Sequence, residues 1–378
     1  MTKQRVLLLV NGPWQAVAAL AALRDRGLNN NNSQFSTVVL DLSRDSDFHS
    51  VTARLLRTEV PSIHSVPKSL TPWNLRRAET YVRSQFGAGL ADADWVFTFG
   101  YHRPASRYFI NGARQAQVVI YEEGLRAYVD PTRLAEREYW TAVDALAIFD
   151  RHFLRRRIDP TFFARKPEYS LLLDGTLPLP QSVSSCSYRH LDAALVREIL
   201  ELLPAPGVRE TTSQCFLIVG QYYSRLKQLS AERELALYTR AARHITQLGY
   251  TPVWRGHIRE KDELFAALQQ ACPELRAFED YVQDAAYPLE FHRRFFTEHC
   301  VATASLASSA PFYLNYLYNT PAFTLATAEI EADMTYPHRD TCAFARRHLP
   351  ALREFRLPNA GEAGATDSAP PDGPSQTW

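Results

Sequence analysis

Residues 5–13 read Arg-Val-Leu-Leu-Leu-Val-Asn-Gly-Pro, and this stretch decides the fold. Its apolar run is uninterrupted as far as Val10, the Asn-Gly-Pro turn breaks it, and Trp14 to Arg24 then repeats apolar residues at helical spacing. A strand without polar alternation, joined to a helix by a short turn, is typical of a parallel sheet covered by helices on both faces. The opening therefore predicts the strand, turn and helix that begin an α/β fold.

The same alternation continues through the first part of the chain. A helical pattern spans Asn74 to Phe86, and further strands are predicted at Thr37–Leu42, Trp95–Phe99, Val118–Tyr121 and Ala145–Ile148. Together these elements predict a first Rossmann-like domain over residues 1–170.

A change in composition marks the end of this domain. Residues 177–185 are rich in Pro and Ser, and a short helix is predicted at Leu191–Leu203, so we interpret residues 171–210 as a crossover linker. The alternation restarts with a strand at Cys215–Val219, a helix at about Ala231–Leu248 and a strand at Thr251–Trp254. Residues 211–357 therefore form a second Rossmann-like domain, which we expect to face the first across a cleft. The segment 358–378 has almost no apolar residues, so we expect it to be disordered.

Composition excludes several classes of protein. The chain has 378 residues and 46% hydrophobic content, enough for two cores, and its 42 Lys and Arg balance 41 Asp and Glu. A formal charge of +1 gives no general attraction to nucleic acid. The apolar run Val6–Val10 is too short for a signal peptide, and no stretch approaches the roughly 20 apolar residues of a membrane span. We expect a cytoplasmic protein, with Arg155–Arg157 as a basic patch for peripheral association with the inner membrane surface or with an anionic acceptor.

No metal site is predicted. The five cysteines are scattered without a CxxC pair or zinc spacing, so we expect them to be reduced and structural. Asp92-Ala93-Asp94 resembles the acidic triplet of metal-dependent glycosyltransferases. It precedes the strand Trp95–Phe99 instead of following it, which places it at the wrong edge of the sheet, and we interpret it as a solvated turn.

Two adjacent carboxylates follow a predicted strand in the first domain. Glu122-Glu123-Gly124 comes directly after Val118–Tyr121, at the carboxyl edge where ligand sites form in parallel sheets. Mutual repulsion of adjacent carboxylates raises the proton affinity of at least one of them, which favours a general base. Taken alone, the tripeptide also fits a solvated acidic turn closed by a glycine.

Two further motifs occupy similar places in the second domain. Arg255-Gly256-His257 follows the strand Thr251–Trp254, where a histidine can donate to a leaving phosphate. Ser308-Ser309 precedes the aromatic helix Phe312–Tyr318, so the serines are predicted at N-cap positions that could cradle a phosphate. Each motif alone also fits an ordinary loop histidine or an ordinary serine cap.

Taken together, the three motifs resemble those of bacterial sialyltransferases and polysialyltransferases, which build lipooligosaccharide caps and capsules. Those families carry an acidic-acidic-Gly motif, a His-Pro motif and a Ser-Ser motif in this order. Softer matches are Gly220-Gln221, Tyr287-Pro288-Leu289-Glu290 and Gln15, so the resemblance spans about Arg5 to Leu325. One departure is that Ile258 stands where the family has the proline after the histidine, and a proline would stiffen that turn.

The resemblance implies the GT-B class of fold and an inverting, metal-independent glycosyltransferase. It would move sialic acid, or a related nonulosonic acid, from a CMP donor to a glycan or glycolipid acceptor without a cofactor. Glu123 would be the general base, with Glu122 raising its basicity or orienting it, while His257, Ser308 and Ser309 would act on the leaving phosphate. The remaining assignments are Gly220, Gln221, Pro288 and Glu290 for the nucleotide, Arg255 or Arg126 for the sugar carboxylate, and Gln15 and Arg126 for the acceptor side.

Other readings stay open at this point. The sugar could be Kdo or another CMP-linked sugar, since these share the same nucleotide. A glycoside hydrolase could use Glu122 or Glu123 with a second carboxylate such as Asp130. An inactive nucleotide-binding protein on the same scaffold would lack turnover altogether.

Overall fold

A computed structural model describes residues 3–40, 46–66, 72–87, 89–100, 104–122, 124–125, 127–129, 167–173, 187–209, 214–257, 262–285, 287–335 and 338–355. The chain divides into two compact units. The first consists of Met1–Val208, Val282–Arg294 and Tyr316–Tyr318, and the second of Arg209–Tyr281, Phe295–Asn315 and Asn319–Trp378. The strand expected at Ala145–Ile148, the basic patch Arg155–Arg157 and the segment 358–378 lie outside the described residues.

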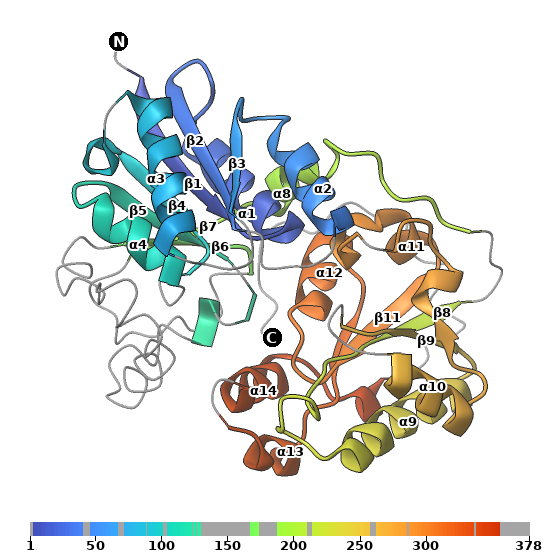
Figure 1. The fold of residues 1–378 in the computed structure, drawn as a ribbon. Coiled ribbons are helices and arrows are strands. Elements are labelled where there is room, and N and C mark those ends of the chain that lie inside the picture. Colours follow the sequence, from blue (N-terminus) through green and yellow to red (C-terminus); the bar gives the residue numbers. More distant parts are fainter. Residues whose placement is uncertain are drawn as a thin grey trace. The chain divides into compact units, whose positions relative to one another are not determined.

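A parallel sheet forms the centre of the first unit (Figure 1). Its described strands are β1 (Gln4–Val10), β2 (Ser33–Leu40), β3 (Ile63–Val66), β4 (Trp95–Thr98), β5 (Gln117–Tyr121), β6 (Glu168–Leu171) and β7 (Ser187–His190). Their order across the sheet is β3-β2-β1-β4-β5-β6-β7, and each neighbouring pair is parallel. The chain therefore switches direction across the sheet between β3 and β4, as Rossmann-like domains do.

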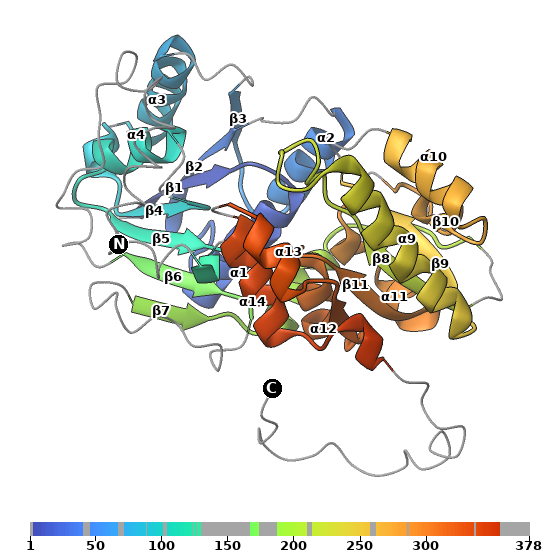
Figure 2. The ribbon, with the colours of Figure 1, turned by 90° about the horizontal axis from the view of Figure 1, so that it is seen from below.

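Helices cover both faces of this sheet (Figures 1 and 2). Those described are α1 (Pro13–Asp25), α2 (Ser46–Leu56), α3 (Pro72–Phe86), α4 (Pro104–Gly112) and α8 (Ala193–Leu200), with a 3-10 turn η1 (Leu90–Asp92). Helix α1 contacts both α2 and α8, whereas α3 contacts β2 and β3. The crossovers are right-handed and run first toward β3 and then toward β7. They therefore place α1, α2 and α8 on one face of the sheet and α3 on the other.

The opening strand and helix form as predicted. Val6 to Val10 are all 0% exposed, because β1 has a sheet neighbour on each side and a helical layer on each face. Ten of the residues of α1, from Pro13 to Leu23, are buried. A helix that is apolar on nearly every side is stable only when neighbours surround it, and here the sheet, α2 and α8 do so.

The second unit is built around a smaller parallel sheet. Its strands are β8 (Cys215–Val219), β9 (Thr251–Arg255), β10 (Arg276–Ala277), β11 (Cys300–Ser305) and β12 (Ala322–Thr324), in the order β10-β9-β8-β11-β12. The described helices of this part of the chain are α9 (Ala231–Gln247), α10 (Asp262–Ala271), α11 (Arg293–Glu298), α12 (Ala310–Tyr318), α13 (Ala328–Asp333) and α14 (His338–His348). Short 3-10 turns of the second unit are η3 (Phe278–Asp280) and η5 (Leu352–Glu354), whereas η4 (Leu289–Phe291) groups with the first unit.

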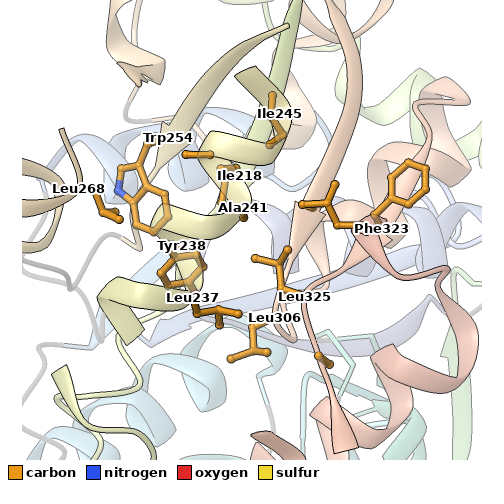
Figure 3. Close-up of a cluster of buried hydrophobic side chains, with 14 of the residues drawn as sticks. Ile218, Leu237, Tyr238, Ala241, Ile245, Trp254, Leu268, Leu306, Phe323 and Leu325 are labelled. Carbon is orange, nitrogen blue, oxygen red and sulfur yellow. The ribbon is translucent and has the colours of Figure 1, made fainter. Parts of the chain in front are cut away.

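Helix α9 packs on this sheet through one apolar face (Figure 3). Ile245 and Tyr238 are 0% exposed, and the ring of Tyr238 meets that of Trp254 edge-on with centroids 4.7 Å apart. Ser230 caps the helix, since its side chain accepts a hydrogen bond from the Arg233 amide. The position of α9 matters for the site because its first turns lie beside the loop that follows β8.

One late segment packs with the first unit instead of the second. Val208 and Val282 form an antiparallel bridge, and the Gln283 amide donates to the Gly207 carbonyl at 2.7 Å. The Tyr316 hydroxyl donates to the Leu191 carbonyl at 2.9 Å. The segment Val282–Arg294, which contains Pro288 and Glu290, therefore belongs by its contacts with the unit that carries Glu122.

Candidate functional site

A buried carboxylate lies at the carboxyl edge of the sheet in the first unit. Glu122 directly follows β5 and is 0% exposed. Its carboxylate accepts hydrogen bonds from the Leu172 amide, at 2.5 Å, and from the Tyr128 hydroxyl. The same hydroxyl accepts one from the Leu173 amide at 2.7 Å. Glu122 thus connects the end of β5 to the chain that leaves β6, and its buried carboxylate has hydrogen-bond donors inside the protein.

The glycine of the acidic motif has a conformational reason. Gly124 has a φ of 133°, a region that residues with a side chain rarely adopt, and its carbonyl accepts from the Ala127 amide at 3.0 Å. A turn therefore follows the carboxylate pair. Glu123 and Arg126 lie outside the described residues, so their assigned roles stay predictions.

Gln15 lies at the same edge of the first sheet as Glu122. It is half-buried in the first turn of α1, directly after β1, and β4 separates β1 from β5. The strands are parallel, so the chain segments that follow them all emerge at one edge. The acceptor-side role of Gln15 stays a prediction.

The second unit brings three predicted motifs to one edge of its own sheet. β8 lies between β9 and β11, and all three strands run in the same direction. Gly220 and Gln221 follow β8, His257 follows β9, and Ser308 and Ser309 follow β11. The loop that begins at Gly220 is therefore flanked by the histidine on one side and by the serines on the other.

Helix α9 fixes the loop after β8. The Gln221 amide donates to the Tyr238 hydroxyl at 3.2 Å, and the amides of Tyr223 and Ser224 donate to the Glu234 carboxylate at 3.0 and 2.9 Å. Glu234 is only 1% exposed. Because these three amides already have acceptors, they are not available to hold a phosphate, and the Gln221 side chain is the better candidate for a nucleotide contact.

Gly220 is required by packing. A Cβ built on it would overlap the indole ring of Trp254, whose side chain is buried against Tyr238. The Gly220 amide also donates to the Arg255 carbonyl at 2.8 Å, which connects the loop after β8 to the end of β9. The glycine is therefore explained without a ligand, and its predicted donor contact stays a prediction.

Two half-buried rings meet beside this loop. The centroids of Tyr222 and His257 are 4.4 Å apart, with an interplanar angle of 57°. Ile258, which replaces the family proline, lies outside the described residues. Arg255 forms an ion pair with Glu279 and lies over the Phe278 ring at 5.5 Å. Its guanidinium is thus already engaged by an acidic and an aromatic partner, which makes it the weaker candidate for the sugar carboxylate.

The two serines differ in what they contact. Ser308 is buried, its amide donates to the Ser305 hydroxyl at 3.1 Å, and its own hydroxyl accepts from the Ala310 amide at 3.2 Å. Ser309 is the N-cap residue of α12, but its side chain makes no capping hydrogen bond, and it is half-buried. Of the two hydroxyls, that of Ser309 is therefore the better candidate for a ligand contact.

Pro288 and Glu290 belong to the first unit, around η4. Glu290 is 6% exposed, and burial raises the pKa of its carboxyl to about 7. The Tyr318 hydroxyl donates to the Glu290 carbonyl, and burial, followed by the charge of Glu290, raises the pKa of Tyr318. A ribose contact by Glu290 stays a prediction, and in the described conformation its side chain faces the protein interior.

The acidic triplet lies where the sequence places it, before β4. The Asp94 carboxylate accepts from the Arg5 amide at 2.7 Å and the Asp92 carboxylate from the Gly89 amide at 2.8 Å, so both cap backbone at the amino edge of the sheet. Among the described residues, no three His, Cys, Asp or Glu side chains are grouped so that they could hold a metal ion. In the same part of the chain, no helix has both the length and the apolar character needed to cross a membrane. The described cysteines, Cys215, Cys272, Cys300 and Cys342, are buried and form no disulfide with one another.

Sequence reasoning missed Tyr222, Glu234 and Tyr128. Glu234 could have been found, because it lies on the apolar face of α9, three and four residues before Leu237 and Tyr238, where an acidic side chain needs a partner. Nothing in the sequence indicates that its partners are loop amides. Tyr222 follows Gly220-Gln221 directly, but its contact with His257 depends on the pairing of β8 and β9.

A comparison of the sequence with protein families gives a finding that is independent of the structure. The model of one family, alpha-2,8-polysialyltransferase (POLYST), matches residues 6–327. The chain belongs to this polysialyltransferase family. Membership makes the protein a glycosyltransferase and confirms the resemblance read from Glu122-Glu123-Gly124, His257 and Ser308-Ser309. A search of curated proteins found no match.

Solved structures share the fold of this polysialyltransferase family member at low sequence identity. A UDP-N-acetylglucosamine 2-epimerase has a TM-score of 0.51 at 11% identity, covering 87% of this chain and 80% of that one. A Listeria monocytogenes protein described as the same epimerase has 0.50 at 9%, covering 88% and 81%. A sialyltransferase from Photobacterium damsela has 0.45 at 10%, covering 90% and 79%. The predicted fold, an α/β chain with two Rossmann-like domains of the GT-B class, is confirmed.

Proposed function

We propose that the protein transfers sialic acid, or a related nonulosonic acid, from a CMP donor to a glycan acceptor, with inversion and without a metal. The observation that carries this proposal is the common sheet edge in the second unit, where His257 and Ser309 flank the loop that starts at Gly220. An imidazole and a hydroxyl on either side of a rigid loop are suited to a single leaving phosphate. Family membership supports the sugar, and the family's name, alpha-2,8-polysialyltransferase, supports an α2,8-linked sialic acid as the acceptor we propose.

The reaction assigns a role to each motif. Glu123 takes the proton of the acceptor hydroxyl, whose oxygen attacks the anomeric carbon from the face opposite CMP. The bond from that carbon to the phosphate oxygen breaks, and CMP leaves with its charge stabilised by His257 and Ser309. Glu122 acts through its position, because its buried carboxylate holds the chain that precedes Glu123. A monophosphate leaving group carries less charge than a diphosphate, which is why a metal is dispensable in this scheme.

Nucleotide binding gives a first test. A ligand that binds only the folded state stabilises it by an amount that grows with the logarithm of the ratio of its concentration to its Kd, which raises the unfolding temperature. We expect CMP to stabilise the protein more than CDP, UDP or GDP in a thermal-shift comparison. A preference for UDP would overturn the choice of donor. CMP-sialic acid and CMP-Kdo, assayed side by side, then separate the two sugars that share this nucleotide.

Two substitutions test the mechanism. Glu123→Gln and His257→Ala should each lower the rate of CMP release by at least about 100-fold, with a short α2,8-linked sialic acid oligomer as acceptor. Matched controls are Glu198→Gln, an exposed carboxylate on α8, and His299→Ala, a half-buried histidine that precedes β11 at the opposite edge of the sheet. Near-normal release by both test variants would remove this mechanism. Hydrolysis of a simple sialoside without nucleotide would favour the hydrolase reading instead.

A further inference from the structure

The contact between Tyr222 and His257 joins the chain segments that follow β8 and β9. Val219 and Arg255 are register partners at the ends of β8 and β9, so Tyr222 and His257 lie three and two residues beyond the same point of the sheet. The rings approach to 4.4 Å between centroids, at 57° to one another. Both residues are half-buried, so each is partly accessible to solvent.

The backbone around Tyr222 is fixed on both sides of the residue. The Gln221 amide before it is held by Tyr238, and the Tyr223 amide after it by Glu234. One residue earlier, the Gly220 amide donates to the Arg255 carbonyl, two residues before His257. Helix α9 and strand β9 therefore fix the backbone that carries Tyr222. The imidazole of His257 packs against the Tyr222 ring.

Ile258 allows rotation about its φ dihedral, whereas a proline at this place would fix that angle near −65°. An imidazole that interacts with a leaving phosphate has to be held closely in place, because a misplacement of about 1 Å at a reacting group can lower the rate about 100-fold. A ring packed against the imidazole can provide this restraint.

We propose that Tyr222 is the positioning residue for His257: its ring holds the imidazole in the orientation that the leaving group requires. This inference rests on the proposed function, in which His257 acts on the departing phosphate. Aromatic contact is the feature that matters, so the hydroxyl of Tyr222 is dispensable. Tyr222 acts through His257 and changes the rate of the chemical step more than donor binding.

Kinetics of three variants test this role. Tyr222→Leu removes the aromatic ring and should lower kcat about 10-fold to 100-fold, with the KM for the CMP-sugar within about threefold of the wild type. Tyr222→Phe keeps the ring and should retain kcat within about threefold. The control Tyr250→Leu removes another half-buried tyrosine of the second unit, which packs on Phe355, and should leave kcat unchanged. An equal loss in the Phe and Leu variants would overturn the inference.

A double-mutant cycle separates positioning from general damage to the fold. If Tyr222 acts through His257, then Tyr222→Leu lowers the residual CMP release of the His257→Ala variant by less than about twofold. A multiplicative loss in the double variant would show that the two residues act independently and would overturn the inference. The proposed function fails separately, if His257→Ala alone keeps normal turnover. If His257→Ala is inactive but Tyr222→Leu is fully active, only the positioning role of Tyr222 is wrong.

Discussion

The hydroxyl of Tyr128 donates a hydrogen bond to the buried carboxylate of Glu122, six residues earlier in the chain. The same oxygen accepts the Leu173 amide at 2.7 Å, so one hydroxyl is both donor and acceptor in a network at the end of β5 and β6. The network holds the backbone that leads into the acidic motif before any substrate is present.

Replacing Tyr128 by Phe should therefore destabilise the protein. The change removes a donor to a buried carboxylate and leaves the Leu173 amide without its acceptor, a loss of about 2–3 kcal/mol in the free energy of unfolding. Urea denaturation at neutral pH measures it. Tyr287→Phe is the control, because its hydroxyl accepts from the exposed Arg54 guanidinium at 3.2 Å. Equal midpoints for the two variants would contradict the network.

Glu234 offers a prediction for the loop after β8. Glu234→Ala leaves the Tyr223 and Ser224 amides without acceptors, which should cost about 2–4 kcal/mol of stability and weaken nucleotide binding, because the loop loses its fixed position. Calorimetry and CMP-induced thermal shifts give the two readouts. The control Glu232→Ala lies on the same helix, fully exposed, and should change both far less. A similar response in both variants would mean that the loop does not depend on α9.

Gly220→Ala tests the close approach of Trp254. The added methyl group meets a buried ring that is packed on Tyr238, and overpacking of this kind costs about 1–3 kcal/mol. Gly89→Ala is the matched control, since its φ is −82° and the nearest atom to its Cβ is 3.6 Å away. We expect a lower unfolding temperature for the first variant only. No loss at Gly220 would show that Trp254 moves aside freely.

The buried carboxyl of Glu290 predicts a pH dependence of stability. Its pKa is raised from 4.5 to about 7 by burial, so the folded state binds a proton that the unfolded state releases. The associated stability is complete below about pH 4.5 and is lost as the pH rises through 7, in total up to about 3 kcal/mol. Glu290→Gln should therefore match the wild type near pH 4.5 and exceed it at pH 8.

Unfolding midpoints measured at both pH values check this sign. The exposed Glu198→Gln variant should leave the difference between the two pH values as it is in the wild type. A Glu290→Gln variant that is less stable than the wild type at pH 8 would mean that the carboxylate is charged and satisfied in the folded protein.

Much of the fold follows from local patterns. The strand at Cys215–Val219 and the helix from Ala231 were predicted correctly, because an apolar run and a capped amphipathic stretch form the same element in most surroundings. The position of His257 at the carboxyl edge of the sheet also follows, since the chain leaves every parallel strand at that edge. These inferences use only neighbouring residues and the geometry of parallel sheets.

Long-range contacts could not be predicted in this way. The segment around Glu290 reads as part of the second domain by its place in the sequence, yet its contacts with Gly207 and Tyr318 place it with the first unit. The burial of Glu234 likewise depends on two loop amides that no periodicity reveals. Such contacts are determined by how distant segments pack, and a single sequence carries little trace of that.

The three amides that α9 holds have a consequence for how the protein evolves. The loop after β8 is ordered when the protein folds. A nucleotide would therefore not have to immobilise this loop, and ordering the loop would add no entropic cost to nucleotide binding. Glu234 and Tyr238 are buried residues of α9. Substituting either of them would then change ligand affinity through the loop that they hold, without contact with the ligand. Variation in nucleotide preference among relatives should accordingly include changes in this helix as well as in the loop itself.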